Sequence, residues 1–247
     1  METSRPDALL HDALAVELVD RLDWRFDAYA SDWMTQLTVA IRTEILDEAT
    51  RDFVQRRPGG RVVNLGAGFC VRGLRLAATD VDWIDLDLDS VIALKRRLVP
   101  ERPGYRYLAA SVLDPAWLDQ LAEKPHRPTL LLAEGLLQYL PRPEVARLLG
   151  NLARRFPGSE MLLEVISPLA VALAALSPTL TRAGLRPQWG IGAVQTLERW
   201  VPGARVAASW SYDRHLDRWG WVRAVAWLPP IRDLMRIVDL RFPVTPA

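Results

Sequence analysis

Residues 61–69 read RVVNLGAGF, a short apolar run that passes directly into two glycines, Gly66 and Gly68. The run predicts a buried strand, and the glycines predict a turn at which the backbone can come close to a ligand. A dinucleotide-binding GxGxxG pattern would need another glycine at position 71, where this chain has Val71. The turn therefore predicts a ligand site at the carboxyl end of this strand, and the missing glycine argues against a bound pyrophosphate.

Four more apolar runs follow, each rich in Val, Leu and Ile and bounded by glycine, proline or acidic residues. They are VDWIDLD (81–87), YRYLAAS (105–111), TLLLAEG (129–135) and MLLEVIS (161–167). Helical patterns lie between them, the clearest being PEVARLLGNLARRF (143–156), with its apolar residues on one stripe. This alternation predicts an α/β fold with a doubly wound parallel sheet.

The whole chain, 1–247, is expected to form one domain with three parts. Residues 1–58 form a helical cap, because apolar residues recur at helical spacing over 7–57 until Pro58-Gly59-Gly60 interrupts them. Residues 59–167 form the ligand-binding core, and residues 168–247 form a lid and strands on the substrate side. The lid is predicted as a helical stretch from Pro168 to Trp189, and the last strands as 204–212 and 220–227.

The C-terminal part is rich in aromatic residues, since six of the ten tryptophans lie between Trp189 and Trp227. These side chains are expected either to pack in the core and along the sheet edge or to form an aromatic wall over a substrate. The apolar stretch 228–242 fits a core segment or a homodimer surface equally well.

The composition excludes several classes of function. With 31 basic and 30 acidic residues, the chain lacks the field that nucleic acids or anionic membrane surfaces attract. One cysteine, Cys70, and three scattered histidines exclude a disulfide framework and predict no metal site. The N-terminus lacks the apolar core of a signal peptide, and no apolar stretch is long enough to span a membrane. A soluble, cytoplasmic protein with a small-molecule substrate is therefore expected.

Polar residues near the ends of the later runs are the candidate binding residues. In the second run, Asp85 and Asp87 share one face. An acidic side chain here can accept both hydroxyls of a ribose, in NAD or in S-adenosylmethionine. Asp87 is favoured because it lies nearest the strand end. After the third run, Ser111 is the expected adenine contact, whereas Asp114 is expected to cap the next helix.

Glu134 at the end of the fourth run is a carboxylate on a buried strand, which is costly unless it is paired. Its expected partner is a cation, either the ammonium of an amino-acid ligand or Arg42 from the helical cap.

Several motifs together resemble a known family. VVNLGAGF, WIDLDLDSVIALKR, SVLDPAW, LLLAEGLLQYLPRPEV and IRTEILD are similar, in order and spacing, to the leucine carboxyl methyltransferase-like group of class I S-adenosylmethionine-dependent methyltransferases. Within that group they are most similar to the O-methyltransferases of polyketide biosynthesis, the tetracenomycin type. The resemblance implies a Rossmann-like sheet of seven strands, the last antiparallel, and S-adenosylmethionine as cofactor.

The resemblance also implies roles for individual residues. Arg42 would bind the methionine carboxylate of the cofactor, and Glu134 would face the methionine end. The glycine turn, the ribose position and the adenine position correspond to Gly66, Ala67, Gly68, Asp87, Leu88, Ser111 and Val112. Members of the family usually continue G-A-G-L-D-T-R, and here Cys70 and Val71 replace the Asp and the Thr while Arg72 is kept. Cys70 is expected to be a buried filler rather than a nucleophile.

The predicted reaction is O-methylation of a carboxyl or phenolic hydroxyl of a small natural product. A carboxylate is already ionised at neutral pH, whereas a phenol benefits from a general base. Candidates for such a group are Tyr139, Tyr212, Asp213 and His215. The alternatives are an NAD-dependent oxidoreductase, a non-catalytic methyltransferase-fold scaffold, and an enzyme that uses the bound sulfonium only as a positive charge.

Overall fold

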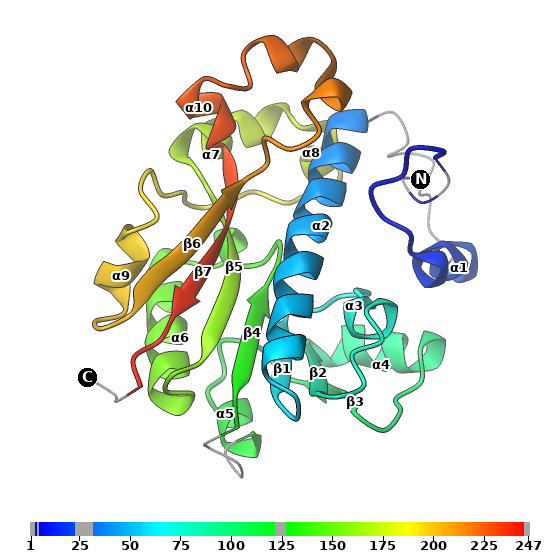
Figure 1. Cartoon of the computed structure of the whole chain (residues 1–247), viewed down its shortest axis with the longest axis vertical. Helices are drawn as coiled ribbons and strands as arrows, with labels where there is room; N and C mark the ends of the chain where they lie inside the picture. The colour runs from blue at the N-terminus through cyan, green and yellow to red at the C-terminus, as the bar shows by residue number, and fades with distance from the viewer. Residues whose placement is uncertain (1–2, 4, 23–31, 122–126, 245–247) are drawn as a thin grey trace.

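The computed structural model describes residues 3, 5–22, 32–121 and 127–244, and its centre is a seven-stranded sheet (Figure 1). The strand order is β3-β2-β1-β4-β5-β7-β6. The strands are β1 (Arg61–Leu65), β2 (Asp82–Asp87), β3 (Tyr105–Ala109), β4 (Thr129–Ala133), β5 (Glu160–Ile166), β6 (Arg205–Ser211) and β7 (Met235–Arg241). The first five pair in parallel, and β7 runs antiparallel to both β5 and β6. The five predicted apolar runs and the antiparallel last strand are confirmed.

Helices cover both faces of the sheet, because alternate strand residues point to opposite sides. One face carries α1 (Ala13–Arg21), α2 (Trp33–Arg56), α3 (Arg72–Arg75) and α4 (Asp89–Leu98), and its core includes Ile45, Val62 and Trp83. The other carries α5 (Ala116–Gln120), α6 (Arg142–Arg155) and α9 (Thr196–Trp200), with Val63 and Leu149 in its core. The predicted N-terminal helices are confirmed as α1 and α2, and α2 ends just before Pro58 as expected. Residues 23–31 lie outside the described part.

The carboxyl ends of the parallel strands point to one end of the molecule, where the short helices gather (Figure 1). These are η3 (Leu137–Tyr139), α7 (Pro168–Leu173), η4 (Ala174–Leu176), α8 (Pro178–Arg182), η5 (Leu216–Ala224) and α10 (Pro229–Arg232). The segment predicted as helical from Pro168 to Trp189 is helical only as far as Arg182. Within the described ranges, no helix has both the length and the apolar character needed to cross a membrane.

The prediction of a last strand at 220–227 is wrong. Residues 220–224 belong to η5, which is kinked at Gly220 (φ 53°, ψ −131°), and residues 225–227 form a turn. Trp221 and Trp227 are 76% and 68% exposed. The seventh strand lies in 228–242, where Ile237, Val238 and Leu240 are fully buried beside β5. Aromatic and β-branched content misled the prediction, since such residues stabilise a strand only where neighbouring strands cover them.

Four of the six C-terminal tryptophans pack against the two cores. Trp189 and Trp200 meet edge-to-face with ring centroids 5.3 Å apart, and Trp210 and Trp219 pack on the α2 side. For these four, the structure supports core packing rather than an aromatic wall.

Candidate active site

The glycine turn after β1 bends through two left-handed residues, Gly66 (φ 61°) and Gly68 (φ 49°). A Cβ on Gly66 would lie 2.8 Å from the Leu136 Cδ1, so this glycine is needed for close packing against the loop after β4. A Cβ on Gly68 would meet no atom within 4 Å. The backbone at Gly68 therefore borders open space, as the approach of a ligand to this turn requires.

Asp87 lies at the end of β2 and contacts the same turn. Its Oδ2 accepts a hydrogen bond from the Gly68 N–H at 2.7 Å, and its Oδ1 accepts one from the Leu88 N–H at 2.7 Å. A carboxylate has about four acceptor positions, so it retains capacity for ligand hydroxyls. Leu88, the residue directly after β2, is 54% exposed.

Asp85, the alternative to Asp87, is fully buried and has a structural role. It accepts hydrogen bonds from Lys95 Nζ at 2.8 Å, Trp83 Nε1 at 2.8 Å, and from the Tyr105 hydroxyl. The Lys95 ammonium also donates to the Cys70 carbonyl at 2.7 Å and so supports the glycine turn from below. Burial and the neighbouring Asp85 raise the pKa of Tyr105, which keeps its hydroxyl a donor.

The segment after β3 lies at the same edge of the sheet. Ser111 is half-buried and its Oγ accepts the Leu113 N–H at 3.3 Å, while Val112 is buried. Asp114 accepts the N–H of Ala116, the first residue of α5, at 3.0 Å. The N-cap position is Pro115, however, so Asp114 bonds the start of the helix from one residue before the position predicted for it.

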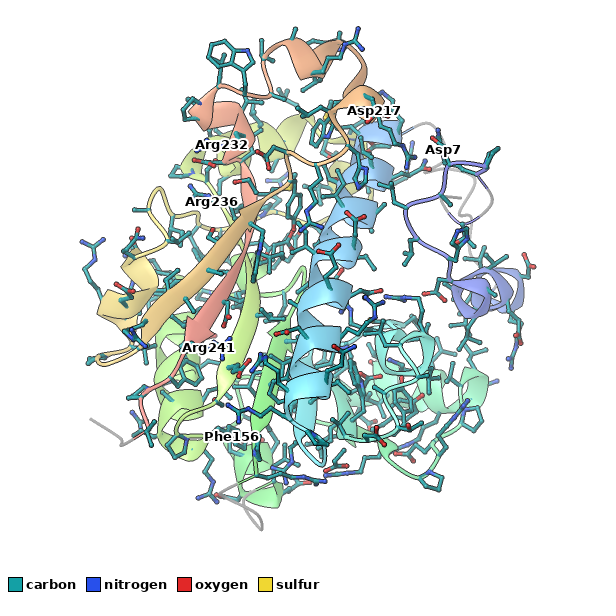
Figure 2. The ribbon with its side chains drawn as sticks, in the orientation of Figure 1. Asp7, Phe156, Asp217, Arg232, Arg236 and Arg241 are labelled. Atoms are coloured by element: carbon teal, nitrogen blue, oxygen red, sulfur yellow. The ribbon has the colours of Figure 1, made fainter. Side chains whose placement is uncertain are left out.

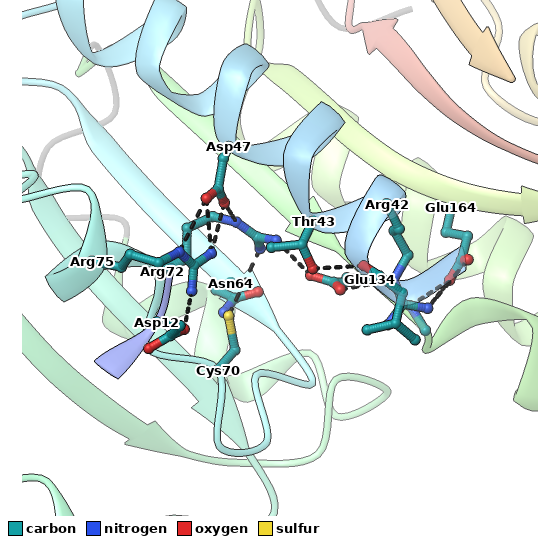
Figure 3. A network of polar contacts seen from close by, with 12 residues as sticks. Asp12, Arg42, Thr43, Asp47, Asn64, Cys70, Arg72, Arg75, Glu134 and Glu164 are labelled. Atoms are coloured by element: carbon teal, nitrogen blue, oxygen red, sulfur yellow. Dashed lines mark hydrogen bonds and ion pairs between the residues drawn. The ribbon is translucent and has the colours of Figure 1, made fainter. Parts of the chain in front are cut away.

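Glu134 follows β4 and pairs with two arginines (Figure 3). It accepts from Arg42 Nε at 2.8 Å and from Arg72 Nη2 at 2.8 Å, which confirms Arg42 as its cationic partner. Burial alone would raise the pKa of Glu134, but the two guanidiniums outweigh it and lower that pKa to about 2. Glu134 is therefore ionised at neutral pH although it is largely covered.

Glu164 in the middle of β5 is the second acidic partner of Arg42, and the sequence analysis missed it. It accepts from Arg42 Nη1 at 3.1 Å, from the Tyr212 hydroxyl at 2.8 Å and from the Gly135 N–H at 2.8 Å. The same sequence feature that identified Glu134, an acidic residue in an otherwise apolar strand, could have identified Glu164. Among the described residues, none accepts a hydrogen bond from Arg42 Nη2, so one terminal nitrogen of this guanidinium remains available as a donor.

The same network continues to the helical cap. Arg72 Nε donates to Asp47 on α2 at 2.7 Å, and Arg75 bonds both Asp47 and Asp12, the residue that caps α1. Figure 3 shows this chain of ion pairs running from Asp12 to Glu164. The cap is thereby joined electrostatically to the end of β4 and to the interior of β5.

The remaining candidates lie in different surroundings. Tyr212 is buried, and burial together with Glu164 raises its pKa well above the usual value. Tyr139 is half-buried on η3, and burial raises its pKa too. His215 Nε2 lies 2.9 Å from Glu44 Oε2 on α2, and Asp213 lines a surface hollow with Ser209 and Arg236.

The two residues that depart from the family pattern pack near this network. The Cys70 Sγ lies 3.8 Å from Arg72 Nη1, and burial raises the pKa of its thiol, which disfavours the reactive thiolate. Val71 is buried in the α2-side core.

Comparison with known proteins identifies the family. The sequence profile of the leucine carboxyl methyltransferase family matches residues 1–153. The chain is 35% identical over 212 residues to the tetracenomycin polyketide synthesis O-methyltransferase TcmP of Streptomyces glaucescens, covering 85% of this chain and 78% of that protein. It is 31% identical to the S-adenosyl-L-methionine-dependent methyltransferase dpfgK of Gibberella zeae, covering 90% of this chain and 82% of that one.

Solved structures agree with the fold. An S-adenosylmethionine-dependent methyltransferase from Anabaena variabilis superposes with a TM-score of 0.56 at 14% identity, covering 87% of this chain and 94% of that one. One from Mesorhizobium loti superposes with a TM-score of 0.53 at 20% identity, covering 74% and 91%. The chain thus belongs to the leucine carboxyl methyltransferase family and is an enzyme, an S-adenosylmethionine-dependent methyltransferase. The nicotinamide alternative is set aside.

Proposed function

We propose that this enzyme methylates an oxygen, a carboxylate or a phenolic hydroxyl, of a small and largely apolar polyketide-like molecule. The observation that carries this proposal is the similarity to a polyketide O-methyltransferase over 85% of the chain. The apolar character of the segment after β5, described below, is consistent with such an acceptor.

The open turn and its neighbours fit the cofactor. The space at Gly68 would admit the cofactor close to the backbone of the turn. The spare acceptor positions of Asp87 would accept hydrogen bonds from the ribose hydroxyls. Arg42 Nη2 would donate to the methionine carboxylate, a charge-assisted contact that arginine suits. The remaining contacts are proposed for Gly66, Ala67, Leu88, Ser111, Val112 and Glu134.

The charge of the ion-pair network also fits. Four carboxylates (Asp12, Asp47, Glu134, Glu164) meet three guanidiniums (Arg42, Arg72, Arg75), which leaves one net negative charge. S-Adenosylmethionine carries a sulfonium, an ammonium and a carboxylate, so its net charge is positive and complementary.

The bound cofactor supplies an electrophilic methyl group whose departure leaves a neutral thioether. The protein then has to align the acceptor oxygen with that group and exclude water, because proximity and orientation provide most of the acceleration in such a displacement. A carboxylate needs no base. For a phenol, His215 beside Glu44 is the candidate proton acceptor, since Tyr139 and Tyr212 have raised pKa values and stay protonated.

Transfer of tritiated methyl from S-adenosylmethionine to a panel of hydroxynaphthoic acids and naphthols tests this proposal. Methyl esters release tritiated methanol in alkali and aryl ethers do not, so one assay separates the two acceptor groups. Asp87→Asn should weaken cofactor binding in calorimetry by about tenfold. Asp80→Asn, at the opposite and exposed end of the same β2 region, is the control. Cofactor binding without transfer to any oxygen acceptor would contradict O-methylation as the reaction of this enzyme.

A further inference from the structure

The segment 168–187 after β5 is apolar and yet contributes nothing to the core. Not one of its residues is buried, and four leucines in it are exposed: Leu169, Leu173, Leu176 and Leu185. Helices of a folded domain normally bury their apolar stripe. Exposed apolar residues of this kind therefore indicate a binding site for a ligand or a partner.

This segment lines a cavity of about 380 Å³ that is partly open to solvent. The cavity is lined mostly by small and apolar side chains from α7, η4, α8 and the following loop: Val171, Ala174, Ala175, Leu180, Leu185 and Pro187. Its volume falls within the usual range for sites that take a small organic ligand, roughly 300–1,000 Å³.

Hydrogen bonds place the cavity beside the candidate active site. Just past its lining residues, the Gln188 N–H donates to the Gln138 carbonyl at 2.8 Å, and Gln188 Nε2 donates to the Tyr139 carbonyl at 2.6 Å. Both acceptors belong to η3, four and five residues beyond Glu134. On its other side, the Thr179 hydroxyl donates to Asp32, which caps α2.

The charge in this segment has one sign. Residues 168–187 include Arg182 and Arg186 and no acidic residue. Arg186 is the one charged residue among those lining the cavity. No hydrogen bond or ion pair joins its guanidinium to any described residue, whereas Arg42, Arg72 and Arg75 are all paired.

We propose that this cavity holds the apolar part of the methyl acceptor and that Arg186 selects acceptors carrying an anionic group. The inference rests on the proposed function and narrows its substrate class to organic anions, such as aromatic acids. An apolar cavity would bind a neutral ring system as well, and an unpaired guanidinium at its wall adds attraction for carboxylate or sulfonate oxygens. Arg186 is therefore a specificity-determining residue.

Two dyes with one skeleton test this selection. 8-Anilinonaphthalene-1-sulfonate is an apolar anion, and N-phenyl-1-naphthylamine is the same molecule without the sulfonate. Fluorescence titrations should show that Arg186→Gln weakens anionic dye binding by roughly threefold to tenfold and Arg186→Glu by more, since ligand contact covers the guanidinium. The neutral dye should bind all three proteins within about twofold. Ala174→Phe should weaken both dyes, because the ring fills the cavity.

Arg97→Glu on α4 is the matched control, an exposed arginine outside the cavity lining, and should leave both dissociation constants unchanged. Equal losses for both dyes, no effect of Arg186→Glu, or the same loss in Arg97→Glu would overturn the proposal. A dimer that Leu176→Glu dissociates would assign the segment to a second copy and also overturn it. Calorimetry with S-adenosylmethionine on the same variants tests the proposed function separately, because dye binding requires neither cofactor nor turnover.

Discussion

The guanidinium of Arg72 and the carboxylate of Glu134 lie 2.8 Å apart and join the helix after the glycine turn to the end of β4. Arg72 is 1% exposed and also bonds Asp47 on α2, so one side chain connects the turn, the sheet and the cap (Figure 3). Figure 2 shows the described side chains on the whole ribbon, with Arg236 and Arg241 labelled on β7. The position of the glycine turn therefore depends on a buried charge.

Arg72→Met should be strongly destabilising. The methionine fills much of the volume but leaves Asp47 paired with Arg75 alone and Glu134 paired with Arg42 alone. Because each carboxylate keeps one guanidinium, the expected loss is about 3 kcal/mol, the lower end of the cost of a broken buried pair. Urea unfolding at neutral pH measures it. Arg97→Met, an exposed change on α4, should stay within about 0.5 kcal/mol of the wild type. Equal stabilities for the two variants would contradict a structural role for the network.

Acid sensitivity should depend on Glu134. Its pKa is about 2 in the folded protein and 4.5 in an unperturbed carboxyl, so its stabilisation is fully present above the unfolded value and is lost as pH falls toward 2. The free energy of unfolding of the wild type should fall by about 3 kcal/mol over that interval. Glu134→Gln has no carboxyl at this position and should not show this loss. Unfolding free energies at several pH values should therefore converge for the two proteins in acid. Glu17→Gln, which changes an exposed side chain of α1, should run parallel to the wild type throughout.

Much of the fold could be predicted from the sequence because the parallel strands are buried on both faces. In runs such as TLLLAEG the central residues are all apolar, and glycine or proline marks the ends. The strand order and the place of β7 could not be predicted in this way, because they depend on contacts between distant segments. MRIVDLR pairs with β5 and β6, and nothing local in it distinguishes a central strand from a dimer surface.

The candidate site shows the same division. Asp87 could be predicted because the end of a strand is a local feature, and Glu134 because an acid on an apolar strand needs a partner. The arrangement Arg42–Glu164–Tyr212 could not, since it joins α2, β5 and the segment after β6, with more than a hundred residues between Arg42 and Glu164. Lys95 was also overlooked, because a lysine on a helix is ordinarily solvent-exposed and this one is fully buried.

The two glycines of the turn should respond differently to alanine. Gly68→Ala forces a side chain into left-handed backbone at a cost of about 1–2 kcal/mol, but it meets no neighbouring atom. Gly66→Ala carries the same backbone cost and also collides with Leu136, so it should be the less stable of the two. Thermal unfolding ranks them.

Cofactor affinity tests Gly68 separately from stability. In folded Gly68→Ala, the new methyl group occupies the space proposed for the cofactor, and affinity for S-adenosylmethionine should fall tenfold or more, or about 1.4 kcal/mol. Calorimetry below the unfolding temperature measures this loss. Unchanged affinity in Gly68→Ala would show that the cofactor does not approach the turn at this residue.

Tyr212→Phe separates a structural role from a catalytic one. The phenylalanine keeps the ring in place and removes one donor to Glu164, which retains Arg42 and the Gly135 N–H, so the unfolding free energy should drop by about 1–2 kcal/mol. Because the pKa of Tyr212 is raised well above its usual value, its hydroxyl stays protonated and kcat should change less than about threefold. The basic limb of the pH–rate profile should keep its midpoint. Tyr139→Phe, measured beside it, reports a half-buried tyrosine on η3. A hundredfold fall in kcat for Tyr212→Phe alone, with cofactor affinity intact, would instead mean that its hydroxyl contacts the acceptor.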